Sequence, residues 1–137
     1  MSVFVDTNVI ISFVEQDVNY NKALKIREIK DLITSEFTVL ELNSFFSRKL
    51  KDEILAEAST KYALKVTNVK VVELDMNKLF RKALDLSTKL QLKALDVLQI
   101  SSALLLDAKS FITFDKDILK KRDLIEKVVK IPVSDLR

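Results

Sequence analysis

Two short apolar runs, one near each end of the chain, stop at an aspartate. Val3–Val5 leads directly into Asp6, and Phe111–Phe114 leads directly into Asp115. Runs of this length and composition predict buried strands, and in a parallel sheet the residues that follow the strands meet at one edge. The sequence therefore places two carboxylates at the border of a hydrophobic core, where an unpaired charge is costly.

The segments between these runs alternate between helical and strand patterns. Helices are expected over Asn8–Glu15, Asn21–Ile29, Glu36–Leu50 (after a Thr34 or Ser35 cap), Glu53–Val66, Met76–Leu90 (after an Asp75 cap), Ala94–Leu106 and around Ile118–Leu119. Further strands are expected over Leu32–Ile33, Val69–Leu74 and Val128–Ile131. Strands that alternate with helices favour parallel pairing, and no linker divides the chain, so we expect residues 1–137 to form a single α/β domain.

Two more acids stand in apolar surroundings, this time on expected helices. Glu41 lies between Leu40 and Leu42, and Asp96 lies inside Ala94–Leu98. Taken singly, each is explained at least as well by a structural role, such as pairing with a buried lysine or capping a helix. Taken together, the four acids are more economically explained by one site for a hard divalent cation, because carboxylate oxygens are its usual ligands.

Missing residue types narrow the chemistry further. The chain has no His, Cys or Gly. These absences exclude imidazole bases, thiolate nucleophiles, His- or Cys-bound zinc and glycine-rich phosphate loops. They also mean that a left-handed turn before the Phe111 strand would fall to Asp107 or Lys109. No membrane-spanning segment or signal peptide is recognisable, so we expect a cytoplasmic protein.

Basic residues are concentrated at the end of the chain. The net charge is +3, and the whole surplus lies after Asp115. A cluster there would attract a polyanion such as RNA, although a solvated lysine-rich helix face is the competing interpretation. The candidate RNA-binding residues are Lys116, Lys120, Lys121 and Arg122.

The ordered set of acidic motifs resembles the PIN-domain ribonucleases, and among them the short VapC-type toxins of prokaryotic toxin–antitoxin pairs. The resemblance rests on four segments: Asp6-Thr7-Asn8 after a strand, Ser35–Leu42 around Glu41, Asp96–Ala103, and Thr113–Asp117. Each motif alone is weak, whereas their order and spacing over most of the chain are specific. One departure is the stretch Asp107-Ala108-Lys109, where family members often carry a glycine before the last core strand.

The resemblance implies a PIN-like three-layer α/β/α sandwich around a mainly parallel, twisted sheet of about four to five short strands. It implies that Asp6, Glu41, Asp96 and Asp115 bind Mg²⁺ or Mn²⁺ and hydrolyse RNA to 3′-hydroxyl and 5′-phosphate products. Asp117 is a further candidate ligand, or else an acid that starts a helix. Asn8 and Thr113 would orient the carboxylates, or else cap a turn.

The resemblance also implies an RNA substrate, an inhibitory antitoxin protein and a homodimer. Two alternatives remain open: a catalytically inactive PIN-like module that binds RNA or a partner, and an RNA-processing nuclease with no antitoxin. Other acid-bearing α/β families fit less well. A haloacid-dehalogenase-type phosphatase needs a second Asp where Asn8 stands, and a receiver domain needs paired acids where Val5-Asp6-Thr7 stands.

Overall fold

Five short parallel strands form the centre of the protein. The computed structural model describes all of residues 1–137. The strands lie in the order β3-β2-β1-β4-β5, and every neighbouring pair is parallel. Their bounds are β1 Val3–Val5, β2 Leu32–Ser35, β3 Lys70–Val72, β4 Ser110–Ile112 and β5 Val133–Ser134. The expected parallel sheet is confirmed.

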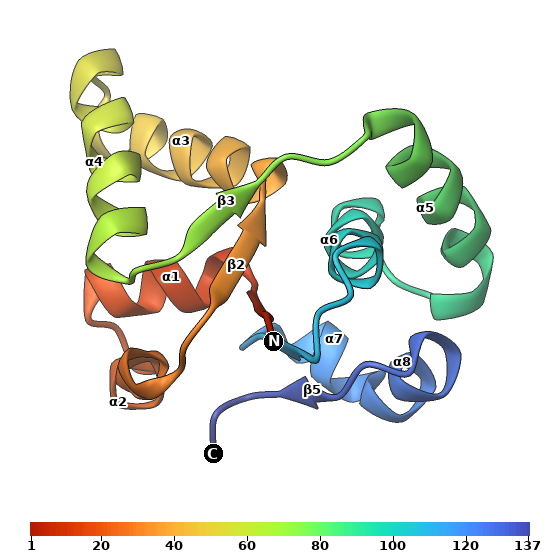
Figure 1. Cartoon of the computed structure of the whole chain (residues 1–137). Coiled ribbons are helices and arrows are strands. Elements are labelled where there is room, and N and C mark those ends of the chain that lie inside the picture. The colour runs from red at the N-terminus through yellow and green to blue at the C-terminus, as the bar shows by residue number, and fades with distance from the viewer.

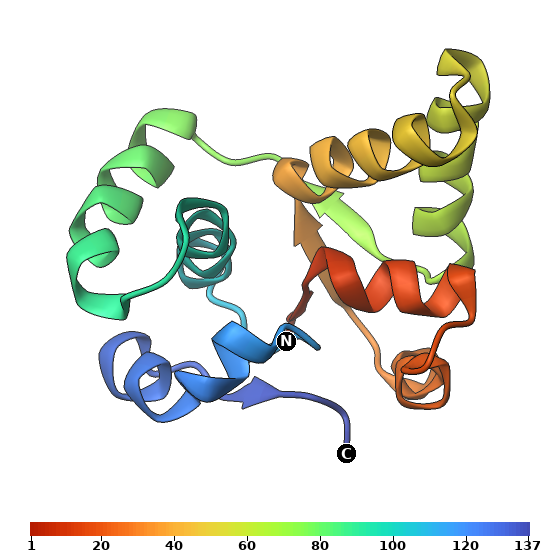
Figure 2. The same ribbon diagram turned by 180° about the vertical axis from the view of Figure 1, so that it is seen from behind.

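Helices cover both faces of this sheet and complete the expected three-layer sandwich (Figures 1 and 2). One side carries α1 (Thr7–Glu15), α2 (Tyr20–Ala23), the 3₁₀ helix η1 (Leu24–Glu28), α3 (Glu36–Leu50) and α4 (Glu53–Val66). The other side carries α5 (Met76–Leu90), α6 (Ala94–Leu105), α7 (Lys116–Lys120) and α8 (Arg122–Val129). The single helix predicted over Asn21–Ile29 is instead the α2–η1 pair.

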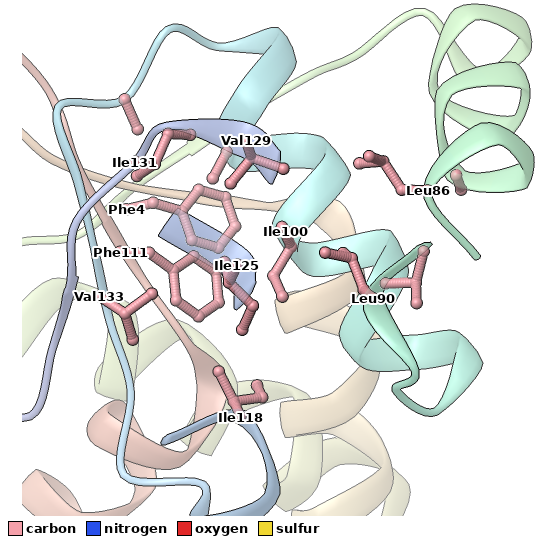
Figure 3. Close-up of a cluster of buried hydrophobic side chains, with 14 of the residues drawn as sticks. Phe4, Leu86, Leu90, Ile100, Phe111, Ile118, Ile125, Val129, Ile131 and Val133 are labelled. Carbon is pink, nitrogen blue, oxygen red and sulfur yellow. The ribbon is translucent and has the colours of Figure 1, made fainter. Parts of the chain in front are cut away.

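Side-chain alternation along β1 fills two separate cores. Phe4 points toward α5, α6 and α8, where its ring stacks on Phe111 with the ring centroids 5.3 Å apart (Figure 3). Val3 and Val5 point the other way, into the core under α1, α3 and α4. Because β1 is buried on both faces, the residue that follows it begins in an environment of low polarity.

Three helices begin and end where the sequence predicts. Ser35, Asp52 and Asp75 accept hydrogen bonds from backbone N–H groups in the first turns of α3, α4 and α5. Such caps stabilise a helix by about 1 kcal/mol each, because they satisfy N–H groups that have no partner within the helix. The caps therefore account for the agreement at these helix starts, including the choice of Ser35 over Thr34.

The lack of glycine leaves left-handed backbone to other residues, of which Asp and Asn tolerate it best. Eight non-glycine residues have positive φ angles: Gln16, Asp31, Lys51, Asn68, Gln91, Asp107, Lys130 and Leu136. Four of them end helices α1, α3, α5 and α8. A Cβ in this conformation costs about 1–2 kcal/mol per residue. The turn before β4 uses Asp107, one of the two residues predicted for it.

One predicted strand is wrong. Val128–Ile131 does not form a strand, because its first residues complete α8, and β5 begins only at Val133. The β-branched residues suggested a strand, but Ile125 and Val129 are buried four residues apart, which is the helical spacing. Pro132 lacks an N–H and is compatible with the start of an edge strand.

Candidate functional site

Asp6 lies at the centre of the carboxyl edge of the sheet. Its N–H donates to Ile112 O at 2.9 Å, which extends the β1–β4 pairing by one residue. Its side chain is 5% exposed. Oδ1 accepts from Thr7 N at 2.9 Å, and Oδ2 accepts from Thr113 Oγ1 at 2.8 Å and Asn8 Nδ2 at 3.2 Å. Both carboxylate oxygens are therefore held in place. Asp6 also lies next to the switch point of the sheet, because the connections that follow the neighbouring strands β1 and β4 run over opposite faces.

Asn8 and Thr113, the two predicted orienting residues, contact each other as well as Asp6. Asn8 Nδ2 lies 3.3 Å from Thr113 Oγ1, and Asn8 Oδ1 accepts from Phe114 N at 2.9 Å. Thr113 Oγ1 also accepts from Asp115 N at 3.0 Å. These bonds join the start of α1 to the segment after β4, so they fix the orientation of the Asp6 carboxylate between the two.

Glu41 reaches the same edge from α3, through a buried polar network. Its Oε1 accepts from Thr7 Oγ1 at 2.7 Å and from Gln99 Nε2 at 3.2 Å. Gln99 on α6 is 1% exposed; its Nε2 also donates to Thr38 Oγ1 at 2.8 Å, and its Oε1 accepts from Ser35 Oγ at 2.6 Å. One glutamine thus connects α6 to α3 across the end of the sheet.

Gln99 was not among the residues predicted from the sequence. It lies one helical turn after Asp96, inside an apolar helix. A polar residue in an apolar run was the signal that identified the four acids, and the same signal applied to an amide would have found Gln99. Thr38 gave no such signal, because a threonine in an amphipathic helix is ordinary.

The remaining acids belong to α6 and α7. Asp96 lies in the first turn of α6 and is half-buried. Asp115 is the N-cap of α7, where its Oδ1 accepts from Asp117 N at 2.8 Å and Ile118 N at 3.1 Å. The exposed Asp117 pairs with Lys93, with Oδ2 and Nζ 3.7 Å apart. Asp117 therefore already has a cationic partner in the free protein.

The pKa of Asp6 shows that the acids approach one another. The pKa of Asp6 is raised to about 7, mainly by burial. Hydrogen bonds from Thr113 and from the N–H of Thr7 lower this pKa but do not cancel the effect of burial. The negative charges of Glu41 and Asp96 raise this pKa further. Thr7 links two of these acids directly, because its N–H donates to Asp6 and its hydroxyl donates to Glu41, so the β1 and α3 acids share one environment with Asp96 of α6.

Asp96 is coupled to the remaining acids in the same way. Burial raises its pKa to about 6, and the charges of Asp115, Glu41 and Asp117 raise it further. The nearby ammonium of Lys93 lowers it. The structure therefore brings Asp6, Glu41, Asp96 and Asp115 to one edge of the sheet, although they are far apart in the sequence.

The chemistry of this edge suits a hard cation. Its acidic side chains offer only carboxylate oxygens, which Mg²⁺ and Mn²⁺ prefer. Burial and neighbouring negative charges raise the pKa values of Asp6 and Asp96, and a bound cation would oppose this rise. As arranged, however, no group of three or more acidic side chains could hold a metal ion. Binding would therefore require the carboxylates to draw together or to contact the ion through water.

The predicted basic residues divide into two sets. Lys120 and Lys121 line a hollow beside the acidic edge, and Lys116 is exposed at the start of α7. Arg122 turns away, and its Nη2 lies 3.8 Å from the buried carboxylate of Asp135 near the C-terminus. The geometry therefore associates the α7 lysines, but not Arg122, with the site.

Comparisons with known proteins agree with this architecture. A family model described as "PIN domain" matches residues 3–124. A chain from a toxin–antitoxin complex of Klebsiella pneumoniae is 22% identical, with a TM-score of 0.65 over 86% of this chain and 90% of that one.

A second solved structure is VapBC2 from Rickettsia felis bound to a promoter DNA fragment. One of its chains is 15% identical, with a TM-score of 0.66 over 98% of each chain. No curated protein matches the sequence. None of the helices combines the length and apolar character needed to cross a bilayer.

Proposed function

The chain belongs to the PIN-domain family, a family of nucleases, and from this premise we propose that it is a metal-dependent endoribonuclease. One observation carries the proposal: Asp6, Glu41 and Asp96 come from three separate elements and interact at a single edge of the sheet. A purely structural explanation would need three unrelated reasons to place carboxylates there, although burial of such charges is costly.

Asp6 and Asp96 are the principal candidates for binding Mg²⁺ or Mn²⁺, and Glu41 and Asp115 would bind directly or through water. Such an ion, when bound, lowers the pKa of water so that hydroxide can attack phosphorus at neutral pH. Asp117 is a weaker candidate, because its carboxylate pairs with Lys93. RNA would be hydrolysed to 3′-hydroxyl and 5′-phosphate ends.

The protein's own residues would prepare this site in two ways. Thr113, Asn8 and the N–H of Thr7 fix both oxygens of Asp6, so the carboxylate keeps its orientation without an ion. Because the pKa of Asp6 is about 7, a large share of molecules hold a proton there at neutral pH. Cation binding should displace this proton and should tighten as pH rises.

We further propose that the enzyme is the toxin of a toxin–antitoxin pair and that it acts in the cytoplasm. The two similar solved chains come from a toxin–antitoxin complex and from VapBC2, which supports an antitoxin partner. Large apolar side chains are exposed on α4 and α5, including Ile54 (80%), Tyr62 (63%) and Phe80 (60%). Such exposure is typical of protein interfaces and supports an antitoxin contact or a homodimer.

Cleavage of single-stranded RNA by the purified chain tests the activity. We expect cleavage with Mg²⁺ or Mn²⁺, none with a chelator, and loss of cleavage in Asp6→Asn and Asp96→Asn. Glu57→Gln, on the exposed face of α4, is the matched control and should cleave normally. End labelling should show 3′-hydroxyl and 5′-phosphate products. Unchanged cleavage in both aspartate variants would overturn the assignment.

A catalytically inactive RNA-binding module is the second candidate, and the separation of the carboxylates favours it. It would bind RNA with an affinity that falls with salt, but it would never cleave. The neighbouring reading frame separates the two nuclease roles. A small DNA-binding protein encoded immediately upstream supports the toxin, whereas its absence supports an RNA-processing nuclease without an antitoxin.

A further inference from the structure

A polar groove lies directly beside the acidic edge. It has a volume of about 360 Å³ and lies between the α5–α6 connection and α7. We call it the basic groove, and its six lining residues are Gln91, Leu92, Lys93, Asp117, Lys120 and Lys121. These residues belong to neither of the hydrogen-bond networks around Asp6 and Glu41.

The basic groove holds more positive than negative charge. Three lysines line it against a single acid. Lys93 pairs with that acid, Asp117, whereas Lys120 and Lys121 have no carboxylate within ion-pair distance. Two ammonium groups without counter-ions, next to a cluster of acids, form a local site for an anion.

One of the two free lysines has a hydrogen-bond partner in the groove. Lys121 is half-buried, and its Nζ donates to Gln91 Oε1 at 2.8 Å. Gln91 itself is the left-handed C-cap of α5, with φ of 57°. The ammonium keeps two further N–H donors for a ligand. This arrangement differs from a solvated lysine face, where each side chain moves freely and an ordered position costs entropy.

The basic groove and the acidic edge share a border. Lys93 and Asp117 line the groove, and the charges of both act on the carboxyl group of Asp96. Asp117 also follows the cap Asp115 in the same first turn of α7. The groove and the acidic edge are therefore adjacent at Lys93 and Asp117.

We propose that the basic groove binds a backbone phosphate of single-stranded RNA, next to the phosphate that is cleaved. Lys120 and Lys121 supply the charge, and Gln91 positions Lys121. The inference rests on the proposed nuclease function, which supplies the RNA strand. The groove has no aromatic side chain on which a base could stack, and Leu92 is its single apolar residue. It therefore contacts the backbone and does not select sequence.

Binding of labelled single-stranded RNA tests the groove separately from catalysis. The measurement is fluorescence anisotropy over a range of salt concentrations, with chelator present and Asp6→Asn as the common background. Lys120→Gln and Lys121→Gln are compared with Lys61→Gln, which removes the same charge from the exposed face of α4. Each lost phosphate contact should reduce the magnitude of the slope of log binding constant against log salt concentration by about 0.7. It should also weaken binding about fivefold near 0.1 M salt.

The outcomes distinguish this proposal from the proposed activity. A double Lys120→Gln/Lys121→Gln variant that binds RNA as tightly as the Lys61→Gln control would overturn the proposed phosphate site, whatever the result of the cleavage assay. Selective loss of affinity in the double variant would support the groove even if the wild-type chain never cleaved RNA. In an otherwise intact enzyme, the double variant should raise KM for RNA and leave kcat nearly unchanged, because the acids are untouched.

Discussion

The two walls of the acidic edge are built differently. The first, which we call the strand wall, consists of Asp6 directly after β1 and of Glu41 on α3, which bonds to Thr7 next to Asp6. Both carboxylates accept hydrogen bonds from side chains or backbone fixed by the fold. The helix wall consists of Asp96 and Asp115. Asp96 is half-buried and its pKa reflects burial and neighbouring charges, with no hydrogen bond among the causes. Asp115 accepts bonds only within its own helix start.

This difference separates a preorganised wall from an adjustable one. The carboxylates of the strand wall cannot turn without breaking buried or partly buried hydrogen bonds, each of which costs about 1–3 kcal/mol when a partner is left unsatisfied. Asp96 has no side-chain hydrogen bond to break, and the charges of Lys93 and Asp117 in the basic groove act on it. We therefore expect the strand wall to set the position of an ion and the helix wall to adapt to the ion and to RNA.

The largest expected effect is on cleavage. Asp6→Asn and Asp96→Asn should each lower the cleavage rate at least about a hundredfold. Replacing a residue that only orients a metal ligand lowers activity about 10–100-fold, and replacing the ligand itself should lower it more. Stability should separate the walls. Asp6→Asn replaces one acceptor oxygen with an NH₂ group and should lower the melting temperature of the metal-free protein, whereas Asp96→Asn breaks no hydrogen bond and should not. Cleavage assays and thermal melts of both variants test this. Normal cleavage by Asp96→Asn would show that Asp96 of the helix wall is not needed for catalysis.

The second effect is a pH dependence that the strand wall should dominate. The pKa of Asp6 is 3.8 when unperturbed and about 7 in the fold, so between these values the folded state keeps a proton that the unfolded chain releases. The free energy of unfolding should therefore fall as pH rises through this window, by up to about 1.4 kcal/mol per unit, and level off above it.

Asp96 should contribute to the same fall only up to about pH 6, and less strongly because it is partly solvated. Urea unfolding with chelator at several pH values tests the contrast. Asp6→Asn should flatten the curve between about pH 6 and 7, where Asp6 contributes more than Asp96. A curve as steep as that of the wild type would show that Asp6 does not carry the buried charge.

Gln99 tests whether the strand wall depends on its buried network. Gln99→Met keeps the volume but leaves Ser35, Thr38 and Glu41 short of a partner. We expect a loss of about 2 kcal/mol in unfolding free energy and roughly 10–100-fold slower cleavage. Ser102→Ala is the control on the same helix, because its hydroxyl bonds only to Leu98 O. Cleavage unaffected by Gln99→Met would mean that Glu41 needs no support from α6.

Local sequence signals predicted the parts of the fold that local interactions determine. The bounds of α3, α4 and α5 follow from caps at Ser35, Asp52 and Asp75, which act within one helical turn. The convergence of Asp6 and Asp115 follows from a general property of parallel sheets. These predictions needed no knowledge of tertiary contacts.

The parts that the sequence did not reveal depend on contacts across the fold. Gln99 bonds to residues about 60 positions away, and no local pattern announces such a bond. Lys93 joins the α7 lysines only because the α5–α6 connection folds against α7. At Val128–Ile131, strand propensity gave way to helical packing of Ile125 and Val129.

The smallest effect concerns two left-handed helix ends, Lys51 on α3 and Gln91 on α5. Glycine at either position removes the Cβ strain but adds unfolded-state entropy, so each variant should gain about 1 kcal/mol of stability. Their effects on RNA should differ. Lys51 lies outside both walls and outside the basic groove, whereas Gln91→Gly frees the Lys121 ammonium and should weaken RNA binding at the basic groove. Equal RNA affinity of the two variants would show that the position of Lys121 is unimportant, and that its charge alone attracts the strand.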